Sequence, residues 1–335
     1  MELQKTSGMG TRLALCLAAA LAAACSSPAA EKPKTDAAVA ADAGVDAVTL
    51  PDAATVTTAP TWHDSFAVCW TDMKCQRAFV ISHGGDWASG DGRPYDSKAA
   101  FLRAYDKGAD GIKTDFLVSK DNVGIVAHSS PIEFWESSEC QGKLIEEMTA
   151  AEVTACHLFD LPEDAQTQTY QRVDDVIEWA RGKVTLMLTV KDSTAFARAI
   201  ETILEHKAAE FVHIETHFGD LALIQTLPNW DKVRYTVQID DQLADIDALV
   251  KLPPVLFCEM NPTYTGLDAA GLQALIDTKV HAAGMRAFVS SQKLPSVEQH
   301  KGLWDAGFDV VMTYNLANAM EARTAVNAAR GISPP

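Results

Sequence analysis

The sequence lacks a surplus of positive charge and any cluster of metal-binding cysteines. It has 28 basic and 45 acidic residues among 335, which gives a formal net charge of −17 at pH 7. Such an acidic chain argues against nucleic acid or an anionic membrane face as the main partner. Its seven cysteines form no paired Cys or Cys/His pattern. We therefore expect no metal site built from cysteine.

The chain also lacks an apolar run long enough to cross a bilayer, and its N-terminus has the pattern of a secretory signal. Lys5 and Arg12 precede the apolar run LALCLAAALAAA, which ends in small residues before Cys25. LAAAC resembles a bacterial lipobox, although its leucine lies one place early. We expect residues 1–24 to be removed and Cys25 to be lipidated. A plain cleaved signal peptide, with Cys25 incidental, is the alternative.

Residues 25–60 are rich in Ala, Pro, Thr and Asp without helical or strand periodicity, which predicts a disordered tether. Residues 61–335 are expected to form a single domain. The signal carries one net positive charge, so the mature chain would have a charge of −18. The expected location is outside the cytoplasm, as a periplasmic or cell-surface lipoprotein held at the membrane by the lipid on Cys25.

Five cysteines lie beyond the signal and the lipobox. In an oxidising compartment an odd number implies pairs and one remaining thiol. We expect Cys69 to pair with Cys75 and Cys140 with Cys156, because they are close in sequence. Cys258 lies in the apolar run PVLFCEM and is expected to be a buried thiol. The alternative is that some or all of them stay reduced.

From about residue 76 the chain alternates β-branched runs with amphipathic helical stretches, several closed by glycine. Eight such units over roughly 260 residues predict a single (β/α)8 TIM barrel. A doubly wound open sheet is the rival, but SHGGDWASGDG lacks the GxGxxG spacing of its phosphate-binding turn. The expected strands are 78–83, 111–119, 183–191, 211–218, 233–240, 254–260, 286–292 and 310–315.

Polar residues recur at the C-terminal ends of these strands, which in a TIM barrel share one rim and carry the chemistry. They are His83, Lys113, Asp115, Lys191, Glu215, His217, Asp240, Glu259, Gln292, Tyr314 and Asn315. His83 and His128 each end a short apolar run. Because histidine titrates near neutral pH, the two can act as acid and base on one substrate.

The segment from ISHGG through PYDSKAAFLRAYDKGADGIKTDFLVSKDNVGIVAHSS resembles the signature of the glycerophosphodiester phosphodiesterase family, within the phospholipase C-like phosphodiesterase superfamily. The family pattern runs HRG, PENT, AF, GAD, ExD, TKDG and HD. His83, Phe101, Asp115 and His128 fall on family positions. The resemblance implies a TIM barrel that hydrolyses phosphodiesters, with His83 and His128 as catalytic residues. It extends more weakly toward the C-terminus.

Several positions depart from this pattern. Gly84 replaces the family arginine, and Tyr95 and Asp96 replace the Glu and Asn of PENT. The glutamate of ExD is Lys113, and the third-strand ExK has Thr189 in place of its glutamate. In the family two glutamates and the aspartate hold a divalent cation. Of these three carboxylates only Asp115 is retained.

Lys113 and Asp115 are two apart on a strand, so their side chains share a face. An ammonium about 4 Å from a divalent ion would be repelled by roughly 8 kcal/mol at an effective dielectric of about 20. We expect Lys113, held by Asp115, to replace the family metal. Lys191 would help to neutralise the phosphate, and Glu215 and Tyr314 would contact the substrate.

Two alternatives to this hypothesis remain open from the sequence. A divalent cation, Mg²⁺ or Ca²⁺, could bind at a shifted site formed by Asp115, Glu215, Glu259 and His217. The barrel could be inactive and bind a phosphate ligand.

The substrate is expected to be a small phosphodiester or phospholipid head group. Phe134 or Trp135, in the long 129–164 loop, would hold choline or ethanolamine.

Overall fold

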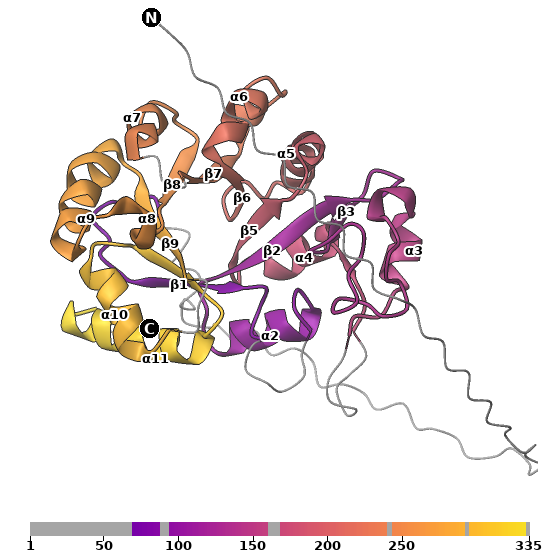
Figure 1. Cartoon of the computed structure of the whole chain (residues 1–335), viewed down its shortest axis with the longest axis horizontal. Helices are drawn as coiled ribbons and strands as arrows, with labels where there is room; N and C mark the ends of the chain where they lie inside the picture. Colours follow the sequence, from indigo (N-terminus) through magenta and orange to yellow (C-terminus); the bar gives the residue numbers. More distant parts are fainter. Residues whose placement is uncertain (1–68, 88–93, 160–167, 240–242, 292–294, 333–335) are drawn as a thin grey trace, which may run out of the picture. The chain divides into compact units, whose positions relative to one another are not determined.

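Eight parallel strands close into a barrel in the computed structural model, with helices around the outside (Figure 1). The predicted TIM-barrel fold is confirmed. The structure describes residues 69–87, 94–159, 168–239, 243–291 and 295–332, which all belong to the compact unit Thr57–Pro335. The expected signal, tether and Cys25, and also Asp240 and Gln292, lie outside these residues.

All eight predicted strands form the barrel, because each is a run of β-branched and apolar residues buried on both faces. β1 pairs in parallel with both β2 and β10, which closes the ring. The barrel strands are β1 (Phe79–His83), β2 (Gly111–Val118), β5 (Thr185–Val190), β6 (Val212–His217), β7 (Arg234–Gln238), β8 (Val255–Glu259), β9 (Arg286–Ser291) and β10 (Val310–Thr313).

The helices that follow the strands begin at residues suited to capping. Ser97 accepts a hydrogen bond from Ala100 N at the start of α2, and Ser296 with Gln299 forms a capping box at the start of α10. The helices are α2 (Lys98–Asp106), α3 (Ala150–Thr154), α4 (Val173–Ala180), α5 (Phe196–Glu205), α6 (Leu221–Ile224), α7 (Ile246–Leu249), α8 (Pro262–Thr265), α9 (Ala269–Leu275), α10 (Val297–Asp305) and α11 (Leu316–Ala329).

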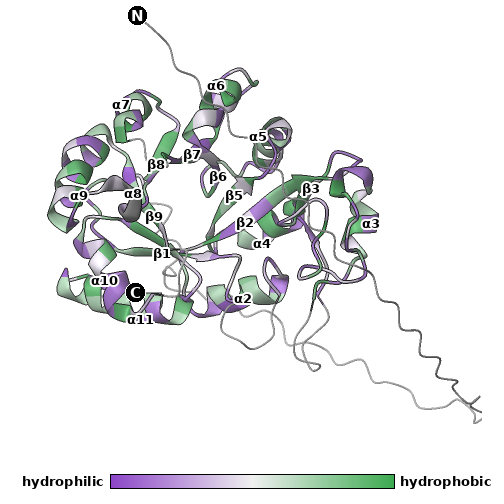
Figure 2. Ribbon diagram, viewed as in Figure 1, coloured by the Kyte–Doolittle hydropathy of each residue, from purple (hydrophilic) through white to green (hydrophobic). Residues whose placement is uncertain are grey.

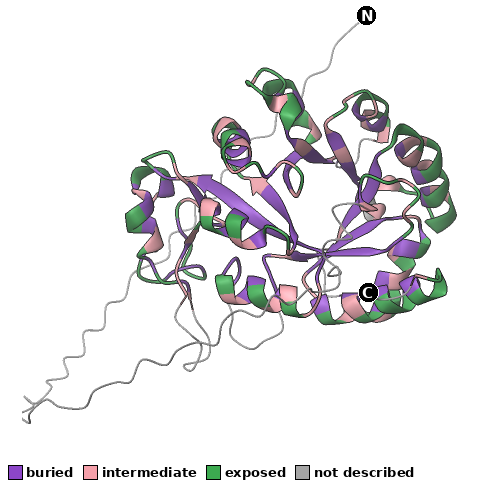
Figure 3. Cartoon of the chain, turned by 180° about the vertical axis from the view of Figure 1, so that it is seen from behind, coloured by how far each residue is buried: buried purple, intermediate pink, exposed green. Residues whose placement is uncertain are grey.

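Apolar side chains fill two layers of the barrel. One layer lies between the strands and the helices, so the strands are buried while the helices expose their outer faces (Figure 3). The other lies inside the ring and includes Trp70, Met187, Phe257 and Phe288. Hydrophilic residues interrupt the apolar strands in few places, one of them on β2 (Figure 2). Polar side chains inside a buried strand are costly unless they are hydrogen-bonded or paired with an opposite charge.

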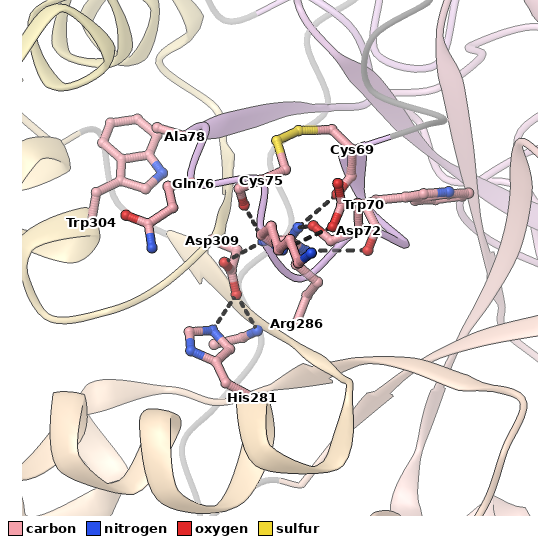
Figure 4. A network of polar contacts seen from close by, with 12 residues as sticks. Cys69, Trp70, Asp72, Cys75, Gln76, Ala78, His281, Arg286, Trp304 and Asp309 are labelled. Carbon is pink, nitrogen blue, oxygen red and sulfur yellow. Dashed lines mark hydrogen bonds and ion pairs between the residues drawn. A yellow bond between two sulfur atoms is a disulfide. The ribbon is translucent and has the colours of Figure 1, made fainter. Parts of the chain in front are cut away.

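The N-terminal end of the barrel is closed by the loop between Cys69 and Cys75, which a disulfide joins. Trp70 is fully buried and packs against the tilted ring of Phe257 in the barrel interior, with ring centroids 5.4 Å apart. The buried guanidinium of Arg286, at the first residue of β9, donates to the carbonyl oxygens of Cys69, Trp70, Asp72 and Cys75 (Figure 4). It also pairs with Asp309 at 2.8 Å. One cation therefore attaches this loop to the barrel.

A small extension that sequence analysis missed follows β2. β3 (Gly124–Val126) pairs antiparallel with β2, and β4 (Gln171–Arg172) pairs antiparallel with β3. Together with α3 they enclose a separate apolar cluster. The Cys140–Cys156 disulfide belongs to that cluster. Both disulfides are the pairs predicted from sequence, and Cys258 is a buried free thiol. Within the described part of the chain, no helix has the length and apolar character needed to cross a membrane.

Candidate active site at the mouth of the barrel

The C-terminal ends of the barrel strands form the mouth of the barrel, where the predicted site residues lie. His83, the last residue of β1, is level with Lys113 on β2. Asp115 is level with Thr189 on β5, and Thr189 is level with Glu215 on β6. Since Ile112 and Phe116 face the helices, Lys113 and Asp115 face the barrel interior. Lys191 and Tyr314 directly follow β5 and β10.

Asp115 is the centre of a buried charge cluster. Lys113 Nζ lies 2.5 Å and Lys191 Nζ 3.0 Å from Asp115 Oδ1. Burial would raise the pKa of Asp115, but the two ammonium groups outweigh it and lower the pKa to about 2. Burial likewise opposes the charge of Lys113, yet Asp115 raises its pKa above the ordinary value. The cluster is therefore charged at neutral pH, with two cations on one carboxylate.

Tyr95 joins this cluster to His83. Its buried hydroxyl donates to Asp115 Oδ2 at 2.8 Å and accepts from Lys113 Nζ at 3.0 Å. Asp96, next in the chain, accepts from the backbone N–H of Asp115 at 3.1 Å. Burial, and then the charge of Asp115, raise the pKa of Asp96 well above its usual value. Both oxygens of Asp115 and its backbone N–H are thus engaged by neighbouring groups.

Two tyrosine hydroxyls flank the imidazole of His83. Tyr314 Oη lies 3.1 Å from Nε2, and Tyr95 Oη lies 3.3 Å from Nδ1. The rings of His83 and Tyr314 are in contact and tilted by 31°, with centroids 4.2 Å apart. Burial, followed by the positive charge of Lys113, holds the pKa of His83 well below its ordinary value. His83 is therefore neutral at pH 7 and able to accept a proton.

His128 also packs against Tyr95, and the centroid of each imidazole is 5.7 Å from that of the Tyr95 ring. Buried Glu136 fixes the backbone of this region by accepting from the N–H groups of His128 and Ser129. Burial lowers the pKa of His128, with partial compensation by the charge of Asp115. The structure thus brings the two predicted histidines together around one tyrosine.

Trp135 from the long loop lies over this site. Its ring is edge-on to His128, with centroids 5.2 Å apart, and 6.0 Å from the ring of Tyr95. Phe134 packs instead near Phe159, at 5.6 Å. Of the two aromatic residues considered from the sequence, only Trp135 contacts the histidine site.

The acidic residues proposed for a shifted metal site are spread along the mouth. Glu215 accepts a hydrogen bond from Thr189, Glu259 is buried at the end of β8, and His217 is exposed at the end of β6. His213 is deep in the barrel, 5.4 Å from the Trp70 ring, and burial lowers its pKa to about 3. Among the described residues, no group of three or more His, Cys, Asp and Glu side chains is arranged to hold a metal ion.

Sequence reasoning missed the roles of Tyr95, Asp96 and Glu136. Tyr95 and Asp96 lie in the loop between β1 and α2, where no strand periodicity indicates which way a side chain points. Their only signal was that both replace residues of the PENT motif. Glu136 gave no signal, because it is one of several acids in the 129–164 loop.

The model of the Glycerophosphoryl diester phosphodiesterase family matches residues 88–316. The chain belongs to this family. The match starts after His83 and includes the other residues of the mouth as far as Tyr314. A comparison with curated proteins finds no match.

Solved structures of two glycerophosphodiester phosphodiesterases and of one phosphodiesterase share the fold of this chain. One from Parabacteroides distasonis is 18% identical with a TM-score of 0.63, covering 79% of this chain and 92% of that one. One from Agrobacterium tumefaciens is 16% identical, with a TM-score of 0.60 and coverage of 73% and 99%. An Oleispira antarctica phosphodiesterase, in complex with the product sn-glycerol-3-phosphate, is 15% identical, with a TM-score of 0.59 and coverage of 76% and 99%.

Proposed function

We propose that this protein hydrolyses a phosphodiester bond of a glycerophosphodiester or phospholipid head group by acid/base catalysis with His83 and His128, and that the Lys113 ammonium replaces the family's divalent cation. The observation that carries the proposal is the contact of 2.5 Å between Lys113 Nζ and Asp115 Oδ1, directly beside His83. The family membership supports phosphodiester hydrolysis.

The residues around Asp115 do not fit a divalent cation. A cation of this kind needs several oxygen ligands with free lone pairs. Oδ1 of Asp115 already accepts from Lys113 and Lys191, and Oδ2 accepts from Tyr95. Lys113 is only 2% exposed, so its charge acts at low dielectric and would repel an incoming cation. We therefore derive no step through a metal.

The proposed reaction uses the chain's own cations. Lys113 and Lys191 are the groups that would neutralise the non-bridging phosphate oxygens as negative charge develops there. One histidine removes the proton from the attacking hydroxyl, from water or from the substrate, as the new P–O bond forms. The other gives its proton to the ester oxygen as the old P–O bond breaks. Glu215 and Tyr314 are proposed substrate contacts.

The substrate class is proposed from the family and from the loop over the mouth. Product sn-glycerol-3-phosphate in the Oleispira antarctica relative supports a glycerophosphodiester. Trp135 offers an aromatic face beside His128, which suits a choline or ethanolamine head group. We further propose that the protein is exported and anchored through a lipid on Cys25, so that membrane phospholipid products would be its source of substrate.

The test uses the purified full chain in detergent, with glycerophosphocholine as substrate and choline release as the readout. We expect turnover to persist in excess EDTA and to fall at least 100-fold in both His83→Ala and His128→Ala, because general acid/base groups contribute about 10²–10⁴-fold. Loss of turnover in EDTA, restored by Mg²⁺ or Ca²⁺, would contradict the replacement of the metal by Lys113.

Two further outcomes separate the remaining alternatives. Stoichiometric Mg²⁺ or Ca²⁺ in elemental analysis of the purified chain, lost in Glu215→Gln, would identify a shifted cation site. Binding of a panel of phosphodiesters without turnover, unchanged in His128→Ala, would identify an inactive phosphate-binding barrel. Turnover by the EDTA-treated protein excludes both readings.

A further inference from the structure

Tyr95 occupies space that two departures from the family pattern open together. Gly84 has a left-handed φ of 69°, and a Cβ placed on it would lie within 3.0 Å of three atoms of the Tyr95 ring. No side chain at position 84 can therefore coexist with the ring in this place. The family arginine is replaced by glycine where the PENT glutamate is replaced by tyrosine, so the Tyr95 ring depends on the missing side chain at position 84.

The neighbours of the Tyr95 hydroxyl determine the direction of its hydrogen bond. A lysine ammonium has only donors, and an ionised carboxylate has only acceptors. The Tyr95 proton must therefore point to Asp115 Oδ2, and its oxygen must accept from Lys113 Nζ. The remaining lone pair of the oxygen faces His83 Nδ1 at 3.3 Å. Because its own proton points to Asp115, the Tyr95 oxygen can only accept a hydrogen bond from His83 Nδ1.

The imidazole of neutral His83 is consequently oriented at both nitrogens. Nδ1 carries the hydrogen and donates to Tyr95, which leaves the lone pair on Nε2. Nε2 accepts from the Tyr314 hydroxyl at 3.1 Å. Tyr314 is half-buried at the mouth, whereas Tyr95 is buried. The basic nitrogen of His83 is thus the one that faces the mouth.

We propose that Tyr95 is a positioning residue that transmits the charge of the Lys113–Asp115 pair to His83, fixes its Nδ1–H tautomer and thereby makes Nε2 the base. The proposal rests on the proposed phosphodiester hydrolysis and adds the atom that takes the proton. In the step, the O–H bond of the nucleophile breaks and an N–H bond forms at Nε2 while oxygen attacks phosphorus. His128 supplies the proton that the leaving oxygen receives when its bond to phosphorus breaks.

The test substitutes Tyr95→Phe, which keeps the ring beside Gly84 and removes only the hydroxyl. Tyr314→Phe is the matched control, since it removes the hydroxyl on the other nitrogen. The ¹⁵N chemical shifts of His83, assigned with His83→Gln in the full chain at pH 7.5, report the tautomer directly. We expect Nδ1–H in the wild type and in Tyr314→Phe, and a mixture of both tautomers in Tyr95→Phe. We expect kcat of Tyr95→Phe to fall about 10- to 100-fold, with KM changed less than about threefold.

The two readouts distinguish this proposal from hydrolysis itself. If the wild type has the Nδ1–H tautomer, Tyr95→Phe has a mixture and neither protein shows turnover, the positioning is supported and the proposed reaction is contradicted. Turnover by a wild type in which His83 is the Nε2–H tautomer overturns the positioning. This measurement needs only the wild type and His83→Gln, which assigns the signals. An unchanged tautomer in folded Tyr95→Phe, checked by circular dichroism, also overturns it.

Discussion

Lys113 keeps its charge at a site where burial alone would favour the neutral amine. Asp115 raises the pKa of this lysine, and the two lysines lower the pKa of Asp115 to about 2. Neither effect exists without the partner, so the three groups form a single charged unit. With two ammonium groups on one carboxylate, the unit has a net positive charge of the kind that an incoming phosphodiester requires.

Removing the Lys113 charge tests whether that unit acts on the reaction. In Lys113→Gln we expect kcat to fall about 10²- to 10³-fold, as when one preorganised charge-stabilising donor is lost. Lys191→Gln should cost less, because the Lys191 side chain is 31% exposed and can be replaced in part by water. Steady-state kinetics at pH 7.5 on both variants provide the measurement. Equal losses would show that burial of Lys113 has no special role.

Asp96 offers a prediction about stability against pH. Its pKa is raised above 3.8 by burial and by Asp115, so the folded state favours the neutral acid. The stabilisation by this group is complete below the unfolded pKa of about 4 and is lost as pH rises toward the folded value. Asparagine cannot ionise, and it tolerates the left-handed φ of 57° found at this position.

We therefore expect Asp96→Asn to raise the free energy of unfolding by about 1–3 kcal/mol at pH 8, the size of one buried polar penalty, and to change it little at pH 4. Urea unfolding at both pH values provides the measurement. Asp231→Asn, on an exposed aspartate, is the control and should show no such pH-dependent gain. A gain of equal size at both pH values would mean that the pKa of Asp96 is the same in the folded and unfolded states, and would contradict the prediction.

At the scale of elements, the barrel strands could be predicted because each combines an apolar run with a polar end. β3 and β4 could not, because three and two residues are too short for a periodic pattern. The same limit applies within the site. Lys113 and Asp115 were placed by strand alternation, whereas Tyr95 is on a loop and depends on the empty volume at Gly84. Contacts that depend on volume appear only once the chain is folded.

Arg286 makes a testable link between two elements, the Cys69–Cys75 loop and β9. It is 1% exposed and donates to four loop carbonyls and to Asp309. Arg286→Met should destabilise the fold by about 3–5 kcal/mol, because Asp309 loses its guanidinium partner and keeps His281, and the carbonyls lose their donor. Thermal or urea unfolding measures this, with exposed Arg172→Met as a nearly neutral control.

The same variant separates the two ends of the barrel. Arg286 begins β9 at the N-terminal end, whereas the histidines lie at the mouth. We expect kcat of Arg286→Met to stay within about twofold of the wild type at temperatures where it is folded, since Arg286 lies at the opposite end of the barrel and, among the described residues, shares no partner with His83 or His128. A loss of activity larger than about tenfold in the folded variant would show that the loop also shapes the mouth.

For the whole molecule, net charge and the proposed lipid act in opposite directions at a membrane. The chain without its signal would have a charge of −18, which disfavours attachment to anionic lipid surfaces. Lipidation supplies about 0.8 kcal/mol for each buried CH₂, and stable anchoring takes more than one acyl chain. A diacyl group on Cys25 would thus exceed the electrostatic cost, and substrate would be met at the bilayer surface.

This balance predicts the behaviour of Cys25→Ala in a bacterial host that processes lipoproteins. We expect the wild type to fractionate with membranes, enter the detergent phase and incorporate labelled fatty acid. The variant should lose the label and remain in the aqueous phase, because the acidic domain has no electrostatic attraction to compensate. Turnover of a water-soluble phosphodiester should be equal for both proteins, since the substitution lies far from His83 in sequence and alters only the anchor. An unlabelled, aqueous wild type would instead identify a plain cleaved signal peptide, and a membrane-bound Cys25→Ala would require an attachment independent of the lipid.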